Sequence, residues 1–262
     1  MPSLALVTGA SSGIGRVFAQ RLASRGFDLV LVARRKEILE SLGRELTAEH
    51  GIRVEVLQAD LADDAGLKTV EARIETAETL DLLVNNAGFG SVGLFHRNEI
   101  AGQDRMHRLH VLATMRLTHA ALHGMVPRRQ GEIINVSSVA GFMTAPGSVS
   151  YCATKHWMNV FTEGLYMELR NLRSPVTVQA LCPGFTVTEF HDRIDYDRTS
   201  VPRMLWLKAD FVVDASLRGL ERGTLFVIPS LRYKLVVAIL QLLPRGLARF
   251  LAVRRQRRFR RI

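Results

Sequence analysis

Thr8-Gly-Ala-Ser-Ser-Gly-Ile-Gly15 connects the apolar run Leu4–Thr8 to residues 13–25, where a helix is expected. Glycines at positions 9, 13 and 15 allow a tight turn, a close approach of the backbone to a pyrophosphate, and close packing of the helix on the strand. The N–H groups at the start of the helix and the positive end of its dipole also favour a bound phosphate at this turn. Ordinary strand-to-helix turns also use glycine, but the place of this turn after the first strand favours a dinucleotide-binding unit.

Short apolar runs recur along the chain and alternate with segments long enough for helices, such as residues 13–25, 35–50 and 104–125. We predict seven buried strands at residues 4–8, 28–32, 53–57, 81–85, 132–136, 176–180 and 225–228. Strand and helix in alternation indicate a parallel sheet covered on both faces. Because crossovers are right-handed, the expected fold is α/β, a doubly wound, Rossmann-type sheet of seven strands.

Composition excludes several classes of protein. The 262 residues are 47% hydrophobic and 23% charged, which is typical of a globular chain and not of a disordered or fibrous one. The two cysteines, Cys152 and Cys182, cannot form a disulfide framework or a four-ligand zinc site. Free thiols and a cytoplasmic location are expected, and the apolar run at residues 4–7 is too short for a signal sequence, so the mature chain is expected to begin at Met1.

The net charge of +10 is located at one end of the chain. Residues 245–262 contain eight arginines and no acidic residue, which leaves about +2 for the other 244 residues. We therefore expect a single catalytic domain over residues 1–230, with its substrate loop at about 185–208, and an amphipathic basic extension over residues 231–262. Few aromatic residues accompany the arginines, so no nucleic-acid partner is expected.

The extension also carries apolar residues at spacings of three and four between residues 231 and 253. Its longest charge-free stretch, residues 235–243, is far short of the roughly 20 residues that span a bilayer. Two alternatives remain for this apolar stripe. It docks on a neighbouring subunit or on the pocket, or it lies in the plane of an anionic membrane, at the inner face.

The end of the second strand indicates which nicotinamide cofactor binds. A site for NAD places an acidic residue there to accept hydrogen bonds from the ribose diol, but this chain has Val32-Ala-Arg-Arg35. Ala33 has no acceptor, whereas Arg34 or Arg35 can hold a 2′-phosphate through charge-assisted hydrogen bonds. NADP(H) is therefore expected, unless both arginines are simply solvated at the start of a helix.

Tyr151 and Lys155 stand four residues apart in a predicted helix, so their side chains share one face. A free tyrosine has a pKa near 10, and a buried ammonium together with a cofactor cation can stabilise its phenolate. Ser138 ends the fifth strand and can hydrogen-bond the substrate oxygen that Tyr151 protonates. On its own a Tyr-x-x-x-Lys pair is common on helix surfaces.

These motifs occur in an order that resembles the short-chain dehydrogenase/reductase superfamily over about residues 3–230: the glycine turn, Asn85-Asn-Ala-Gly88, Ser138, and Tyr151-x-x-x-Lys155. The resemblance implies that Asp60 and Leu61 meet the adenine and that the segment from Pro183 to Thr188 lies beside the nicotinamide. The candidate cofactor-binding residues are Gly9, Ser11, Ser12, Gly13, Ile14, Gly15, Arg34, Arg35, Asp60, Leu61, Asn86, Ala87, Gly88, Tyr151, Lys155, Pro183, Gly184, Thr186 and Thr188.

One position departs from the family pattern. His110 stands where relatives carry an asparagine whose main chain helps to hold a water in a proton relay. An imidazole there either fills the asparagine site as a satisfied histidine or acts as a proton donor of its own. The other histidines show no metal-binding spacing, so no metal is expected.

The function expected from this set is an NADP(H)-dependent oxidoreductase that reduces a ketone or aldehyde to an alcohol, or the reverse, with Tyr151 as acid and base. Apolar and basic residues in the loop 185–208 suit an apolar or acyl-type small-molecule substrate. A homodimer or homotetramer is expected. The alternative is a non-catalytic nucleotide-sensing protein that keeps the fold without turnover.

Overall fold

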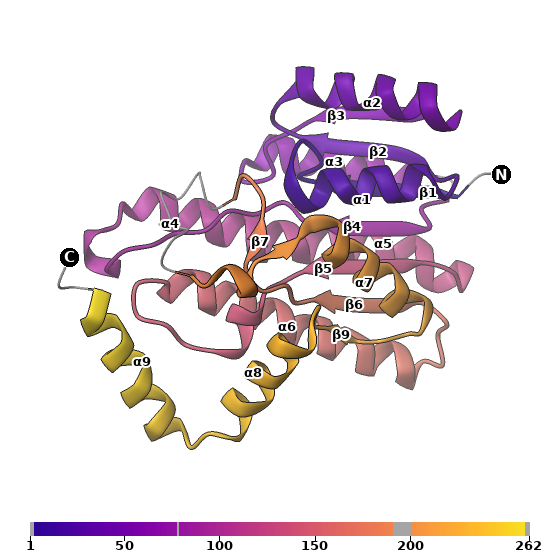
Figure 1. Ribbon diagram of the computed structural model, residues 1–262. Coiled ribbons are helices and arrows are strands. Elements are labelled where there is room, and N and C mark those ends of the chain that lie inside the picture. Colours follow the sequence, from indigo (N-terminus) through magenta and orange to yellow (C-terminus); the bar gives the residue numbers. More distant parts are fainter. Residues whose placement is uncertain (1–2, 78, 191–200, 260–262) are drawn as a thin grey trace.

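The computed structural model describes residues 3–77, 79–190 and 201–259. Its central element is a parallel sheet of seven strands in the order β3-β2-β1-β4-β5-β6-β9 (Figure 1). The strands are β1 (Leu4–Thr8), β2 (Asp28–Ala33), β3 (Val54–Gln58), β4 (Leu82–Asn85), β5 (Glu132–Val136), β6 (Thr177–Leu181) and β9 (Phe226–Val227). The seven predicted strands and the doubly wound fold are confirmed, and no strand end differs from its predicted position by more than one residue.

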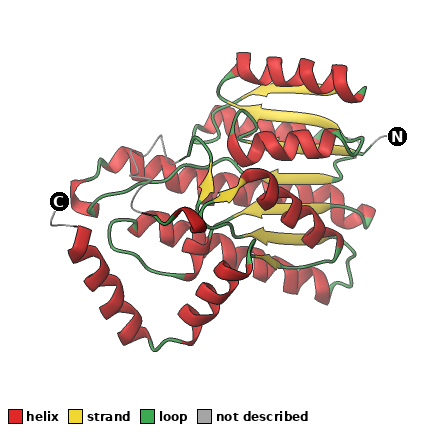
Figure 2. Ribbon diagram, in the orientation of Figure 1, coloured by secondary structure: helices red, strands yellow, loops and turns green. Residues whose placement is uncertain are grey.

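Helices cover both faces of this sheet, as Figure 2 shows. On one side lie α1 (Gly13–Ala23), α2 (Lys36–His50) and α7 (Ala209–Glu221), and on the other lie α3 (Asp64–Glu75), α5 (Thr114–Arg128) and α6 (Val149–Asn171). Alternate strand residues point to opposite faces, so Ala5 and Val7 pack under the first layer while Leu6 packs under the second. Two apolar cores result from one sheet.

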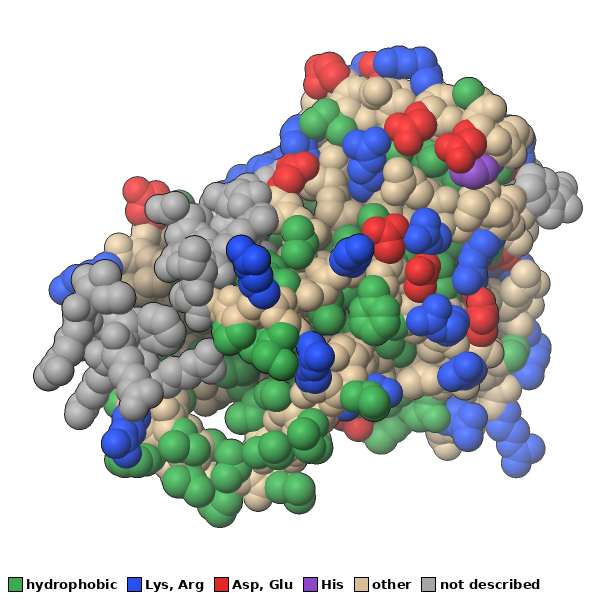
Figure 3. Space-filling view, viewed as in Figure 1, with side chains coloured by type: hydrophobic (Ala, Val, Ile, Leu, Met, Phe, Trp, Pro, Cys, Tyr) green, Lys and Arg blue, Asp and Glu red, His purple; other side chains and the backbone are tan. Residues whose placement is uncertain are grey.

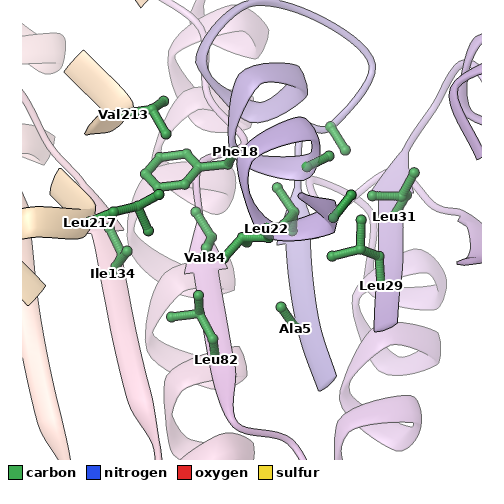
Figure 4. Packing of buried hydrophobic residues seen from close by; sticks show 14 of the residues in the cluster. Ala5, Phe18, Leu22, Leu29, Leu31, Leu82, Val84, Ile134, Val213 and Leu217 are labelled. Carbon is green, nitrogen blue, oxygen red and sulfur yellow. The ribbon is translucent and has the colours of Figure 1, made fainter. Parts of the chain in front are cut away.

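The core between α1, α7 and the sheet shows how the layers interlock. Phe18 of α1 is fully buried and lies close to Val213 and Leu217 of α7, while Leu22 reaches over Val84 of β4 (Figure 4). Burial of side chains of this size stabilises the fold by about 1.5–3 kcal/mol each. The packing fixes α1, and with it the turn that precedes this helix, against the sheet.

The crossover between β4 and β5 differs from the predicted single helix over residues 104–125. The helix begins earlier, as α4 (Ile100–His107), and passes through a π-helical segment, Arg108–Ala113, before it continues as α5. Such wide turns are rare and occur often at functional sites. His110 lies inside this segment and is fully buried.

After β6 the chain forms short elements rather than an irregular loop. Strands β7 (Thr186–Val187) and β8 (Leu207–Lys208) pair in parallel, and a 3-10 turn, Arg203–Leu205, precedes β8. Residues 191–200 of the predicted substrate loop lie outside the described residues. The chain then continues through α7 and β9 into α8 (Leu231–Leu242) and α9 (Arg245–Phe259).

The strand order reverses between β1 and β4, because the chain extends the sheet from β1 through β2 to β3 and then returns to the other side of β1. In open α/β sheets, ligands bind beyond the carboxyl ends of the strands at such a switch point. The segments that follow β1, β4, β5 and β6 meet at this edge.

Candidate active site

The turn between β1 and α1 forms the first part of the site. Gly9 and Gly13 have φ angles of +67° and +55°, a region that residues with a side chain rarely enter. A Cβ at Gly15 would lie 2.3 Å from the carbonyl oxygen of Gly9, so the first turn of α1 packs directly on the loop. Thr188 lies across Gly13, where a Cβ would come within 3.1 Å of it. This side-chain-free cradle at a helix N-terminus fits the pyrophosphate of a dinucleotide.

The residues at the end of β4 hold the glycine turn between β1 and α1 in place. The Thr8 hydroxyl accepts hydrogen bonds from the N–H groups of Asn86 and Ala87, at 2.9 and 3.0 Å, and donates to the Val84 carbonyl oxygen at 3.2 Å. The Asn86 amide donates to the Thr8 carbonyl oxygen at 2.9 Å. The side chain of Asn86 therefore ties β4 to the glycine turn, and Thr8, which the sequence analysis did not single out, is its main partner.

Two arginines follow β2 and differ in their contacts. Arg35 donates to the Ser11 hydroxyl at 3.1 Å and to the Ser11 carbonyl oxygen at 3.2 Å, which places its guanidinium at the glycine turn. It also lies 3.4 Å from a carboxylate oxygen of Glu189. The Arg34 side chain is 64% exposed, with its nearest carboxylate, that of Asp60, 3.9 Å away. Ser11 and both arginines thus gather at the edge where β2 ends.

Asp60 itself is held by other side chains. Its carboxylate accepts a hydrogen bond from Arg105 at 2.7 Å and one from the Ala62 N–H at 3.0 Å. Burial opposes its ionisation, but these two bonds and the nearby Arg34 outweigh burial and hold the pKa of Asp60 below its ordinary value. Leu61 beside it is buried. Contact of either residue with an adenine stays a prediction.

Ser138, Tyr151 and Lys155 come together where β5 ends and α6 begins. The Ser138 hydroxyl caps the short turn Val139–Phe142 by accepting the Ala140 N–H at 3.1 Å, donates to the Pro183 carbonyl oxygen at 3.4 Å, and lies close enough to the Tyr151 phenol to lower its pKa. The Lys155 ammonium lies 5.9 Å from the centroid of the Tyr151 ring, as expected for residues four apart on one helix. The three predicted residues therefore share one site.

The acid–base properties of this group differ from the sequence-based expectation. Burial raises the pKa of Tyr151 to about 12, although the hydrogen bond with Ser138 acts in the opposite direction. Burial also lowers the pKa of Lys155 to about 7, although its ammonium donates to the Val136 carbonyl oxygen at 2.8 Å. Without a cofactor, the protein therefore keeps the Tyr151 phenol protonated at neutral pH and gives Lys155 a pKa close to neutral pH.

His110 packs beneath this group. Its Nε2 atom lies 3.2 Å from the Phe89 N–H, and its Nδ1 atom lies 3.0 Å from the Thr154 hydroxyl. A backbone N–H can only donate, so Nε2 accepts and Nδ1 carries the proton that it donates to Thr154. The Thr154 hydroxyl donates in turn to the Tyr151 carbonyl oxygen at 3.0 Å. Burial first, and the charges of Lys155 and His107 second, hold the pKa of His110 well below its ordinary value.

This arrangement favours the first of the two expected roles for the histidine. A neutral imidazole with both nitrogens engaged is a satisfied residue that braces α6 below the tyrosine. Gly88 makes room for it, since a Cβ there would lie 2.8 Å from Nε2. Thr154 was missed in the sequence analysis because a threonine inside a helix gives no signal of its partner.

The segment after β6 closes the site from the other side. The Thr186 hydroxyl donates to the Gly184 carbonyl oxygen, and the Pro183 carbonyl oxygen accepts the Val139 N–H at 3.0 Å. Tyr233 of α8 packs on this segment so closely that a Cβ at Gly184 would lie 2.0 Å from its ring. The Tyr233 hydroxyl accepts the Phe185 N–H at 3.0 Å and donates to the Leu205 carbonyl oxygen at 2.7 Å. No local pattern in the sequence indicates this contact.

A cavity of about 340 Å³ opens between the β4–α4 segment and the start of α4, and this size lies within the range of ligand pockets. Phe89, Ser91, Val92, Asn98 and Gln103 line it. Ser91, Asn98 and Gln103 also line a smaller and more enclosed space that reaches Tyr151. Substrate selection was predicted for residues 185–208, and this cavity is a second candidate wall that was not predicted. In the described part of the chain, no three His, Cys, Asp or Glu side chains gather as a metal site.

Comparisons with known proteins agree with this arrangement. Residues 3–199 match the family model described as short chain dehydrogenase. Nodulation protein G of Rhizobium sp. (strain N33) is 38% identical over 192 residues, which cover 73% of this chain and 76% of that protein.

Two solved structures are similar over nearly the whole chain. A short-chain dehydrogenase from Sphingobium yanoikuyae in complex with NADPH has a TM-score of 0.84 at 39% identity, and the match covers 92% of this chain and 94% of that one. The bulky-bulky ketone specific alcohol dehydrogenase from Comamonas testosteroni has a TM-score of 0.78 at 34% identity, with 94% and 96% covered.

Proposed function

Because this chain belongs to the short-chain dehydrogenase family, its general class is that of oxidoreductases acting on carbonyl and alcohol groups, and we propose that it reduces a bulky apolar ketone or aldehyde with NADP(H). The observation that carries the proposal is the convergence of Ser138, Tyr151 and Lys155 beside the glycine cradle.

The side chains have distinct roles in the proposed reduction. When bound, NADPH supplies the hydride that adds to the carbonyl carbon. Tyr151 donates its phenolic proton to the carbonyl oxygen as the C=O π bond breaks, and a raised pKa keeps that proton in place until it is needed. Ser138 hydrogen-bonds the same oxygen and orients it. Lys155 lies near the phenol and, once protonated beside a bound cofactor, stabilises the phenolate that remains.

The cofactor preference rests on the edge where β2 ends. Arg34 has an exposed guanidinium there, and Arg35 and Ser11 provide further donors close to it. No acidic side chain occupies the position of Ala33, where a ribose diol would seek one. The solved Sphingobium relative holds NADPH, which agrees with this preference.

The substrate class rests on the walls around Tyr151. The cavity lined by Phe89 and Val92 lies on one side, and Phe185 and Trp206, whose rings are 5.5 Å apart, lie in the segment after β6. The Comamonas relative acts on ketones that are bulky on both sides, as its name states. An apolar carbonyl compound with two sizeable substituents suits such a divided site.

The test is an assay of NADPH oxidation with ketones of increasing size on both sides of the carbonyl. We expect turnover that Tyr151→Phe lowers at least about 100-fold, while NADPH affinity changes little, because only the proton donor is removed. Tyr166→Phe on the same helix is the matched control and should keep full activity. NADPH binding without turnover of any carbonyl compound would indicate a nucleotide-sensing protein instead.

A further inference from the structure

We propose that α8 and α9 bind the surface of an anionic lipid bilayer. The contact face, here called the α8 face, consists of Leu231, Leu235, Ile239 and Leu242. Their side chains are 81%, 63%, 49% and 85% exposed. Their spacing of four, four and three places them in one stripe along the helix.

The opposite side of α8 already has a partner. Tyr233 and Val237 are 5% and 3% exposed and pack against the body of the protein. The helix is thus apolar on two sides, one facing the body and one facing solvent. Figure 3 shows the apolar side chains gathered along the lower edge of the molecule, where α8 and α9 lie in Figure 1. Contiguous exposed apolar surface of this kind marks an interaction site.

Helix α9 extends the same surface. Leu247, Phe250, Leu251 and Val253 are between 46% and 59% exposed. Among the helices of the described residues, none is long and apolar enough to cross a membrane. At 1.5 Å per residue, the 12 residues of α8 measure about 18 Å, against roughly 30 Å for a hydrocarbon core. These helices therefore suit a position in the plane of the interface.

Charge identifies the partner. Residues 231–262 contain ten Lys or Arg residues and no Asp or Glu, while residues 1–230 contain 25 basic and 25 acidic residues and have no net charge. Lys234, Arg249 and Arg254 are exposed members of the basic set. In a bilayer with acidic headgroups, the leucine side chains can be buried among the acyl chains and the basic side chains can bind the negatively charged headgroups.

A second copy of the chain fits this surface less well. An isologous contact between two α8 faces would bring the ten positive charges of each copy together, and the body of the protein carries no net negative charge to balance them. Like charges across an interface oppose association.

Binding at this surface would set the position of the active site. Tyr233 bonds to Phe185 and Leu205, and Arg232 donates to the Met204 carbonyl oxygen at 2.7 Å, so α8 is attached to the segment that closes the site. The segment that closes the site would then lie near the lipid, where apolar carbonyl compounds concentrate. The lipid contact itself does not depend on the proposed activity.

The test is co-sedimentation of the full-length protein with vesicles of phosphatidylcholine alone or with phosphatidylglycerol added. We expect binding at least tenfold stronger to the anionic vesicles, and weaker binding as salt is raised. The triple variant Lys234→Ser, Arg249→Ser, Arg254→Ser should bind anionic vesicles roughly 100-fold less tightly.

A paired substitution tests the α8 face. Leu235→Asp with Ile239→Asp should abolish vesicle binding. Leu172→Asp is the control, because Leu172 is 61% exposed at the C-terminal end of α6, shortly before β6 begins and therefore at the amino ends of the strands, and should leave binding unchanged. Circular dichroism of each variant checks that it is folded.

Three results would overturn the proposal. One is the absence of vesicle binding by the full chain, and another is equal binding to neutral and anionic vesicles. The third is self-association in sedimentation velocity that Leu235→Asp with Ile239→Asp removes, since the α8 face would then bind a second copy.

Discussion

Arg34 and Arg35 lie next to each other in the chain, yet the structure holds them differently. Arg35 is engaged with Ser11, whereas the Arg34 side chain is 64% exposed and 3.9 Å from its nearest carboxylate. The exposed arginine can turn toward a 2′-phosphate at little cost.

Arg34→Ala should therefore remove most of the preference for NADPH over NADH. A charge-assisted hydrogen bond contributes about 1.5–3 kcal/mol, so the ratio of the two dissociation constants should fall by at least roughly tenfold. Titration of both cofactors by fluorescence measures the ratio. Lys36→Ala, which removes a neighbouring cation that pairs with Glu40, is the control. An unmodified protein that binds both cofactors equally would contradict the proposed preference.

Lys155 is a buried cation, and its substitution should show the cost of burial. Its pKa is about 7 in the folded protein and about 10.4 in an unfolded chain. Below pH 7 the lysine is charged in both states and the folded state bears the full cost. Between pH 7 and about 10.4 the unfolded state binds more protons, so the stability of the native protein rises with pH.

At pH 6 the free energy of unfolding of Lys155→Met should accordingly exceed that of the native protein by roughly 2–5 kcal/mol. This difference should shrink toward pH 10. Urea unfolding at pH 6 and pH 9.5 measures both differences, and turnover should be lost. If the difference in unfolding free energy were the same at both pH values, the apolar packing of the methionine alone would explain the added stability.

His110 should not contribute an ionisation to the rate. Its nitrogens are both hydrogen-bonded and its pKa is well below 6.5, so it is neutral throughout the range in which the enzyme is assayed. His110→Asn should lower kcat less than tenfold and leave the dependence of kcat on pH between 6 and 8 unchanged. A group with a pKa near neutrality that disappears in the variant would show that His110 transfers a proton.

Sequence reasoning predicted residues that the structure brings together in the candidate site, but it did not predict their ionisation. Glycines, Ser138, Tyr151 and Lys155 follow strand ends or share a helix face, and these relations are local. The pKa values of Tyr151 and Lys155 depend instead on how completely β5, α6 and the segment after β6 enclose them. Enclosure is a property of tertiary packing, which a motif does not encode.

At the scale of elements, the strands were predictable because each is a short apolar run between turn signals. The π-helical segment at Arg108–Ala113 was not, since its extra backbone width arises where α4 and α5 pack around His110. The short pair of β7 and β8 and the contact of α8 with Gly184 join parts of the chain that are 21 or more residues apart. No local pattern in the sequence reports such contacts.

Gly184→Ala tests the contact between α8 and the site. A methyl group at this position would meet the Tyr233 ring at 2.0 Å, so either the helix or the segment after β6 must move. Overpacking of this kind costs about 1–3 kcal/mol of unfolding free energy. Gly124→Ala in α5, where nothing lies within 4 Å, should be neutral or stabilise by up to about 1 kcal/mol. Urea unfolding compares the two, and equal stabilities would show that Tyr233 yields without strain.

At the scale of the whole molecule, two exposed apolar surfaces have different charge. The α8 face lies among ten basic residues, whereas α6 exposes Val160 and Met167, at 54% and 61%, beside the stacked rings of Trp157 and Phe161. The residues that precede α8 are balanced in charge, so nothing opposes the approach of a second copy there. We expect α6 to form the contact of a homodimer or homotetramer.

Val160→Asp should therefore lower the mass of the assembly, as measured by light scattering after size exclusion. A charge buried in an apolar contact is costly, and the assembly should dissociate. Ile239→Asp, on the α8 face, should leave the mass unchanged. The reverse pattern would assign self-association to α8 and remove the basis of the lipid contact.

The hydrogen bonds of the Tyr233 hydroxyl affect the conformational entropy of the segment after β6. The hydroxyl of Tyr233 binds both Phe185 and Leu205, which are the two ends of a loop of about 20 residues. Bringing together the ends of such a loop costs about 2–3 kcal/mol in lost chain configurations. The β7–β8 pair and Tyr233 hold these two ends together in the folded protein, so that loss is already met before any substrate arrives. Tyr233 thereby acts as a noncovalent cross-link between Phe185 and Leu205, and more of the substrate's contact energy can appear as affinity.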